Sequence, residues 1–320
     1  MEAFKKYLEG KKYYPSTIQQ TITRVNKFAE WLQPQYGWNF EEFENIAYKH
    51  LLDYVQHEQK RGISTGTLHR SINSISHYFE FLNKENDSIN NPARTLRIKG
   101  RAKKITQNPL QYDELEKLYH GYKELINNPQ TPNINTPKHL QQRSILAHER
   151  NGIIVGLLVY QALASGELEK LSVEDINLTA GTIYIAGNAR SNSRTLPLNT
   201  QQVLPLYSYI HGGTREKLQA LPAIGLPSNH REGEHFKNSL LVGKMYGVVK
   251  QILQELRGIN PQIKNAQHIR ASVILHWLKQ HNKRQVQYMA GHRYIDSTEK
   301  YALQQMDTLT DALTKYHPFG

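Results

Sequence analysis

The sequence contains no cysteine, which excludes a disulfide framework and a metal site built from thiolates. The opening residues, Met1–Lys6, lack the apolar core of a signal peptide. Apolar runs are short as well: the best, residues 153–159, is far below the roughly 20 residues that span a bilayer. We therefore expect a soluble cytoplasmic protein with no membrane span.

Acidic residues are scarce relative to basic ones. The chain holds 28 acids against 40 lysines and arginines, a formal charge of +12. The excess is even along its length, with 17 basic against 11 acidic residues through Lys104 and 23 against 17 afterwards. A positive balance in both halves is typical of a protein that holds a polyanion from two sides. Ordinary solubility charge is the alternative explanation.

Helical spacing of apolar residues predicts a small bundle over residues 1–93. Its first clear helix should begin with a capping box formed by Ser16 and Gln19. Apolar positions then recur at helical spacing within residues 18–32, and similar patterns follow in residues 46–55 and 68–82.

A strongly basic stretch follows, which we predict to be a linker over residues 94–106. Such runs are usually solvated, but this one lies between two folded patterns, which favours a strap across a phosphate backbone. Each phosphate that it neutralises would add about −0.9 to the slope of log K against log salt. The candidate DNA-binding residues are Arg94, Arg97, Lys99, Arg101, Lys103 and Lys104.

The second domain is predicted to span residues 107–320. It should contain a buried helix over residues 153–163 and two short strands, 182–185 and 195–198, around a polar turn. Helices over 272–280 and 284–290, a loop-rich stretch over 211–233 and a last helix over 307–316 complete it. The predicted fold class is mainly α, with a small antiparallel β-hairpin in the second of two domains.

Near the C-terminus, three residue types suited to phosphoryl transfer follow one another. Arg270 precedes Gly291-His292, and Tyr301 lies nine residues after the histidine. Taken singly, a tyrosine is usually packing surface and an arginine a surface ion pair. Together they supply a cationic cradle for a phosphate and a hydroxyl that can attack it, which is chemistry that needs no metal or cofactor.

This frame resembles the C-terminal signature of the tyrosine recombinases, the phage-integrase family. The resemblance implies that Tyr301 forms a 3′-phosphotyrosine, while His292 and Arg270 donate hydrogen bonds to the phosphate. It also implies a helical core-binding domain at the N-terminus. The implied partners are double-stranded DNA, on which the protein works as a homotetramer, and the implied location is the nucleoid.

Two departures from the family concern its first arginine and its lysine. The turn that carries the arginine has Ala164 at that position. Arg150 is a poor substitute because fourteen helical residues separate the two positions by ~21 Å. The hairpin that should carry the lysine has none, and we predict that Arg190, or else Arg194, partly replaces the missing arginine. Arginine is a reluctant proton donor, since its pKa exceeds ~12.

A third departure concerns a histidine that the family places three residues before its second arginine. That position is Gln267, and His268 lies one residue closer to Arg270. We predict that His268 contacts the phosphate.

The leading prediction is a site-specific recombinase of a mobile element. A DNA-binding protein that keeps the fold but has lost efficient catalysis is one alternative, supported by Ala164 and the hairpin without lysine. A type IB topoisomerase shares the nucleophile and the phosphate cradle, but the N-terminal bundle argues against it.

Overall fold

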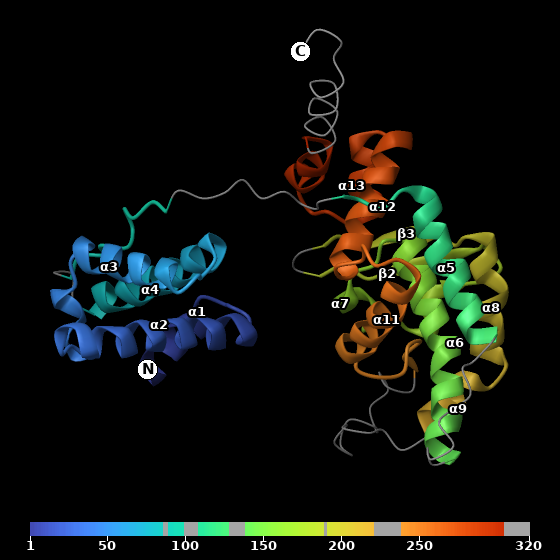
Figure 1. Ribbon diagram of the computed structural model, residues 1–320, viewed down its shortest axis with the longest axis horizontal. Helices are drawn as coiled ribbons and strands as arrows, with labels where there is room; N and C mark the ends of the chain where they lie inside the picture. The colour runs from blue at the N-terminus through green and yellow to red at the C-terminus, as the bar shows by residue number, and fades with distance from the viewer. Residues whose placement is uncertain (86–88, 99–107, 128–137, 189–190, 221–237, 304–320) are drawn as a thin grey trace, which may run out of the picture. The chain divides into compact units, whose positions relative to one another are not determined.

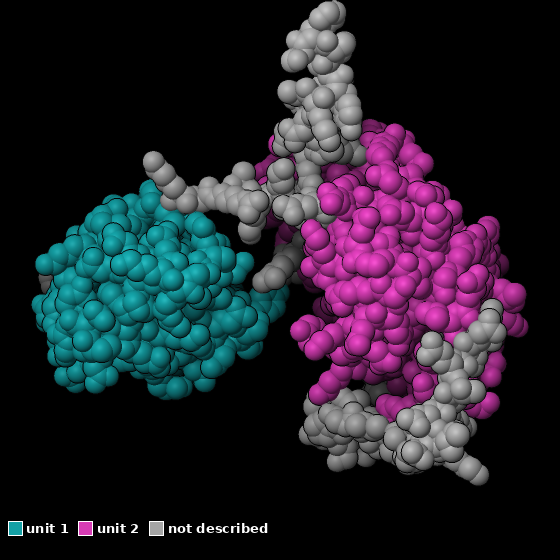
Figure 2. All heavy atoms as spheres, viewed as in Figure 1, with its two compact units in different colours: residues 1–103 teal, residues 104–320 magenta. Residues whose placement is uncertain are grey.

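The computed structural model describes residues 1–85, 89–98, 108–127, 138–188, 191–220 and 238–303. The chain forms two compact units, residues 1–103 and 104–320 (Figures 1 and 2). Both consist mainly of helices, and the second carries a small antiparallel sheet. The predicted fold class is confirmed. No helix in the described ranges is long and apolar enough to cross a bilayer.

The first unit is a helical bundle with an aromatic core. Its elements are α1 (Glu2–Gly10), α2 (Pro15–Tyr36), the 3-10 helix η1 (Glu41–Asn45), α3 (Tyr48–Lys60) and α4 (Thr65–Glu85). Phe28 of α2 is fully buried. Its ring meets those of Tyr54 and Phe43 edge to face, with centroids 4.9 and 5.8 Å apart. This is a favoured geometry for aromatic pairs, and it joins α2, η1 and α3.

Helix α2 begins one residue before the predicted cap. Pro15 is its first residue, and Tyr14 occupies the N-cap position without a side-chain hydrogen bond. The predicted capping by Ser16 was therefore wrong. Proline suits the first helical position because its φ is preset and its missing N–H would have no helical partner.

The chain stays with the first unit beyond residue 93, where we expected the bundle to end. Ala93 and Leu96 are buried in its core, and Ile98 packs against that core. Arg94 and Arg97 are exposed between these anchors. The other predicted DNA-binding residues, Lys99, Arg101, Lys103 and Lys104, lie outside the described residues.

The second unit is built around helix α6 (Lys138–Tyr160), against which several of the described helices pack. Residues 151–159 are buried without interruption, so this half of α6 has no solvent face. The surrounding helices are α5 (Tyr112–Asn127), α8 (Thr200–His211), α9 (Thr214–Ala220), α11 (Met245–Ile259) and α12 (Ala266–Gln280). Two more helices, α7 (Ser165–Leu168) and α13 (Lys283–Ala290), lie beside the candidate site.

The sheet has three antiparallel strands in the order β1 (Ile176–Asn177), β2 (Thr182–Ile185), β3 (Arg194–Pro197). The 3-10 helix η2 (Val173–Asp175) leads into β1. Ile183 pairs with Leu196 and Ile185 with Arg194, and all four side chains are buried. Because side chains alternate across a strand, Arg194 belongs to the same inward row as Leu196. The sheet thus places a guanidinium group in the interior.

Candidate active site

Two buried arginines share one buried glutamate in the second unit. Nη1 and Nη2 of Arg194 donate to the two carboxylate oxygens of Glu167, at 2.7 and 3.1 Å. Nη1 of Arg270 also donates to Glu167, at 3.3 Å. The three side chains are 0%, 10% and 4% exposed for Arg194, Arg270 and Glu167. The cluster carries a net charge of +1 away from water, which suits it to an anion.

The turn between α6 and α7 holds this cluster in place. Glu167 accepts a hydrogen bond from the backbone N of Ala164 at 2.8 Å, so the same carboxylate closes the start of α7. Ala162 has a φ of +50°, a left-handed conformation that costs a residue with a Cβ about 1–2 kcal/mol. Its carbonyl accepts a hydrogen bond from Nη1 of Arg270.

Arg270 extends from the first turns of α12 and ties three segments together. Asn265 caps this helix by accepting from the backbone N of His268 at 2.9 Å. Besides its bonds to Ala162 and Glu167, Arg270 donates through Nη2 to the carbonyl of Ala290, at 2.6 Å. The ends of α6 and α13 and the short helix α7 therefore meet at a single guanidinium.

The charges of the cluster follow from burial and pairing. Burial lowers the pKa of Arg270, and the charge of Glu167 opposes this effect. For Glu167, burial raises the pKa, but the hydrogen bonds and charge of Arg194, with the charge of Arg270, outweigh it and leave the pKa below its usual value. The carboxylate is thus ionised at neutral pH.

Gly291 brings the Gly-His turn against Arg194. It ends α13 with a φ of +67°, the left-handed region that favours glycine. A Cβ at this position would collide with the guanidinium of Arg194. The backbone N of Asn192 donates to the carbonyl of Gly291 at 3.0 Å, and Ser191 forms a bridge with His292. The hairpin and the turn are thus held together.

Tyr301 and His292 lie side by side at this centre. Their rings stack with centroids 5.7 Å apart and an interplanar angle of 16°. Nδ1 of His292 is 2.9 Å from the hydroxyl of Thr298, and the hydroxyl of Tyr301 accepts from Nε2 of Gln267 at 3.3 Å. Tyr301 is only 6% exposed.

The ionisation of this pair is shifted by its surroundings. Burial, followed by the charges of Arg270 and Arg194, lowers the pKa of His292 to about 4, so the ring is neutral at pH 7. Burial raises the pKa of Tyr301, partly offset by the charge of Arg270 and the hydrogen bond from Gln267. The phenol is therefore protonated at neutral pH, and losing its proton requires help from a bound anion or base.

The structure brings three predicted catalytic residues, Tyr301, His292 and Arg270, to one place. His268 is buried but bonded elsewhere: its Nε2 is 2.9 Å from the carbonyl of Asn108, and its Nδ1 is 3.4 Å from the backbone N of Lys264. Both ring nitrogens are thus taken by backbone groups, away from Tyr301. Gln267, which the prediction passed over, contacts the nucleophile candidate instead.

Among the arginines considered as replacements, Arg194 lies in the cluster. Arg190 lies outside the described residues. Arg150 donates its hydrogen bonds to the carbonyl of Val242 and to Asn151, not to Glu167. Gln267 could have been found from its position three residues before Arg270, whereas nothing in the sequence marks the contact between Gly291 and Arg194. In the part of the chain that the structure describes, no group of three or more His, Cys, Asp or Glu could hold a metal.

Comparisons with known proteins show which family the chain belongs to. Residues 123–307 match the Phage integrase family, and residues 1–86 match the description "Phage integrase, N-terminal SAM-like domain". Tyrosine recombinase XerC of Bacillus subtilis (strain 168) is 21% identical over 327 residues, covering 99% of this chain and 96% of the relative. Tyrosine recombinase XerD of Halalkalibacterium halodurans is 24% identical over 275 residues, covering 86% and 83%.

Solved structures share the fold. The Tn1549 transposon integrase in complex with transposon right end DNA has a TM-score of 0.62 at 13% identity, covering 98% of both chains. The XerH site-specific recombinase bound to its difH substrate has a TM-score of 0.60 at 16% identity, covering 90% of this chain and 76% of the other. Since the family match spans more than half of the sequence and contains the cluster around Tyr301, this chain belongs to the phage integrase family and is an enzyme of the tyrosine recombinase class.

Proposed function

We propose that this protein is a site-specific DNA recombinase whose nucleophile is Tyr301. The observation that carries the proposal is the hydroxyl of Tyr301 beside a buried cluster of net positive charge, within the residues that match the family. In the proposed step, the phenol oxygen attacks the scissile phosphorus and the bond to the 5′ oxygen breaks. The phenol loses its proton, the 5′ oxygen gains one, and a 3′-phosphotyrosine conserves the energy of the phosphodiester for rejoining.

The phosphate cradle in this proposal consists of Arg270, His292 and Arg194. Arg194 takes the part of the arginine that Ala164 lacks, because Glu167, three residues after Ala164, holds it with two hydrogen bonds. Among the described residues its buried Nε has no hydrogen-bond partner, which leaves a donor for a phosphate oxygen. Gln267 donates a hydrogen bond to the hydroxyl of Tyr301 and holds the nucleophile in this proposal.

The leaving oxygen needs a proton donor other than lysine, since the described hairpin residues include no lysine. His292 is neutral when the site is empty. The negative charge of a bound phosphate raises the pKa of a nearby imidazole. We assign the proton to His292 or to water on this ground.

For the DNA substrate we propose recombination sites of a mobile element, bound by four copies of the chain that exchange strands in pairs. The family match and the shared fold with recombinases support DNA as the partner. Exposed Arg94 and Arg97, beside the core of the first unit, supply phosphate contacts in this proposal.

Covalent trapping on a nicked suicide substrate, made from the ends of the element, tests the nucleophile. We expect the parent to give a DNA-linked protein band on a denaturing gel and Tyr301→Phe to give none, because the variant lacks the attacking oxygen. Tyr294→Phe is the matched control: this tyrosine is 68% exposed, and its loss should leave the band unchanged.

Other outcomes point to the alternatives. Tight, salt-sensitive binding without a band in the parent would favour a DNA-binding protein that has lost catalysis, which Ala164 and the burial of Tyr301 would then explain. Relaxation of supercoiled plasmid without sequence preference would favour a type IB topoisomerase.

A further inference from the structure

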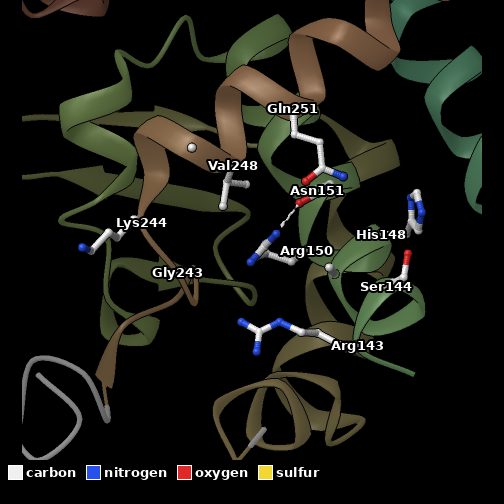
Figure 3. Close-up of a pocket in the computed structure, with 11 residues that line it drawn as sticks. Arg143, Ser144, His148, Arg150, Asn151, Gly243, Lys244, Val248 and Gln251 are labelled. Atoms are coloured by element: carbon white, nitrogen blue, oxygen red, sulfur yellow. Dashed lines mark hydrogen bonds between the residues drawn. The ribbon is translucent and has the colours of Figure 1, made fainter. Parts of the chain in front are cut away.

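A second basic centre lies between α6 and the start of α11. It is closer to the N-terminal end of α6 than the cluster around Glu167 is. It is a cavity of about 420 Å³ (Figure 3). None of its eleven described lining residues is acidic, and three are arginine or lysine. The lining consists of Arg143, Ser144, Ala147, His148, Arg150, Asn151, Gly243, Lys244, Gly247, Val248 and Gln251.

Arg150 forms the buried floor of this cavity. It is 7% exposed. Its Nε and Nη2 donate to Oδ1 of Asn151 at 3.1 and 2.8 Å, and its Nη1 donates to the carbonyl of Val242 at 2.5 Å. Each terminal nitrogen carries two hydrogens. One N–H on each is therefore left without a partner among the described residues.

In the described part of the chain, no ion pair balances the charge of Arg150. Within the described ranges no carboxylate lies within 4.0 Å of it. Burial lowers the pKa of Arg150, and the nearby charge of Arg143 lowers it further. Glu255 acts in the opposite direction, but its carboxylate accepts hydrogen bonds from Tyr122 and Gln251. A buried cation without a close counter-charge is costly, and an anion in the cavity would remove that cost.

The opposite wall of the cavity is the uncapped start of α11. Lys244 is the N-cap residue, and its side chain makes no capping hydrogen bond to the first N–H groups of this 15-residue helix. Gly243 has a φ of +123°, and a Cβ on it would lie 3.1 Å from Nη1 of Arg150. A Cβ on Gly247, in the first turn, would meet nothing within 4 Å. Backbone donors at a helix start favour negative charge.

We propose that this cavity is a binding site for a phosphate group. Figure 3 shows the guanidinium groups of Arg143 and Arg150 projecting from α6 into the same space, across from Gly243 and the start of α11. The planar guanidinium of Arg150, with one N–H on each terminal nitrogen unpaired among the described residues, matches phosphate oxygens. Nδ1 of His148, also in the lining, is a buried atom with no hydrogen-bond partner in the described part of the chain.

The phosphate comes either from a DNA backbone or from a free phosphate compound. The DNA source rests on the proposed function, whereas the free source does not. Because Lys244 and Gly247 are exposed while Arg150 is buried, the cavity has a mouth at the surface and a charged floor. A phosphodiester group of bound DNA and a free phosphate ion would contact the same N–H donors of the cavity.

Two variants of the full chain test the site. Gly247→Glu places a carboxylate at the mouth, in the first turn of α11, where an acid is favourable to the helix. Arg143→Gln removes a cation from the wall. Lys250→Gln is the matched control, since Lys250 is exposed on α11 and does not line the cavity. The melting temperature is measured as a function of the concentration of inorganic phosphate at constant ionic strength. DNA affinity is measured as a function of the salt concentration.

We expect inorganic phosphate to raise the melting temperature of the parent and of Lys250→Gln, and to raise that of both cavity variants less. If the DNA source is right, Arg143→Gln also loses about 0.9 from the salt slope of DNA binding. Loss of phosphate protection with an unchanged slope assigns the free source. Cavity variants that match the parent in both measurements overturn the proposal.

Tyr301→Phe separates this site from the proposed chemistry. That variant should lose the covalent band and keep both the phosphate protection and the salt slope of the parent. A parent that forms no covalent band while the cavity variants lose phosphate protection would sink the proposed nucleophile and leave the cavity site standing.

Discussion

At the scale of single residues, the site depends on how one carboxylate is shared. Glu167 binds Arg194 through both oxygens, Arg270 through one, and the start of α7 through the backbone N of Ala164. A buried carboxylate with these partners is stable only while they remain, because removing one partner of a buried ion pair typically costs about 3–5 kcal/mol. The same residue therefore controls both the fold of the turn and the net charge of the buried cluster.

Relocating a charge tests the role assigned to Arg194. Arg194→Ala should unfold at a lower urea concentration than the parent. The double variant Arg194→Ala with Ala164→Arg should recover stability, because the new arginine lies three residues from Glu167. Arg194→Lys keeps the charge but loses the two parallel hydrogen bonds. We expect covalent trapping by this variant to slow by about 10²-fold, the usual loss when one charge-stabilising donor is removed.

Circular dichroism of Arg194→Lys controls for misfolding. A folded lysine variant that traps DNA at the rate of the parent would show that Arg194 only supports the structure of the turn.

At the scale of elements, the end of α13 decides whether the hairpin and the Gly-His turn can approach. Most elements near the site were predictable: the strand over 182–185 has the predicted bounds, and β3 begins at Arg194, one residue early. Strand β1 was not predicted, because two residues give no alternation to detect. Helix α9 lies in a stretch that we expected to be loop-rich, and the predicted last helix, 307–316, lies outside the described residues.

The contact between Gly291 and Arg194 gives a prediction about this element boundary. Gly291→Ala should lower the free energy of unfolding by more than Gly181→Ala, as measured by urea denaturation. Both glycines have a left-handed φ, +67° and +63°, so both substitutions cost about 1–2 kcal/mol in the backbone. Only at Gly291 does the added Cβ meet the guanidinium of Arg194, whereas at Gly181 it meets nothing within 4 Å. Equal losses at the two positions would contradict the contact.

At the scale of the whole molecule, the two units have separate buried cores. In the described residues, the core of the first unit ends at Ile98 and that of the second begins at Leu110, and the two share no residue. A basic stretch of sequence connects them. Each unit therefore has the apolar core that an independently folding domain requires.

Calorimetry tests this independence. We expect two unfolding transitions, and Phe28→Ala should lower the temperature of only one, because Phe28 is fully buried in the first core. Truncation of a buried phenylalanine costs about 3–5 kcal/mol. Leu204→Ala is the control, since Leu204 is 74% exposed and its loss should shift neither transition. A single transition that moves as a whole in Phe28→Ala would mean that the units unfold together.

The sequence by itself determined the family, the mainly helical fold and three residues of the site. Arg270, His292 and Tyr301 follow one another at the spacing of the family signature, so their proximity could be expected from the resemblance. The choices between neighbours required the tertiary structure. On a helix, adjacent residues point about 100° apart, so the contacts of α12 alone decided that Gln267 meets Tyr301 while His268 meets the backbone. Likewise, Arg194 enters the cluster because β3 turns its inward row toward Glu167, a long-range contact that no local pattern encodes.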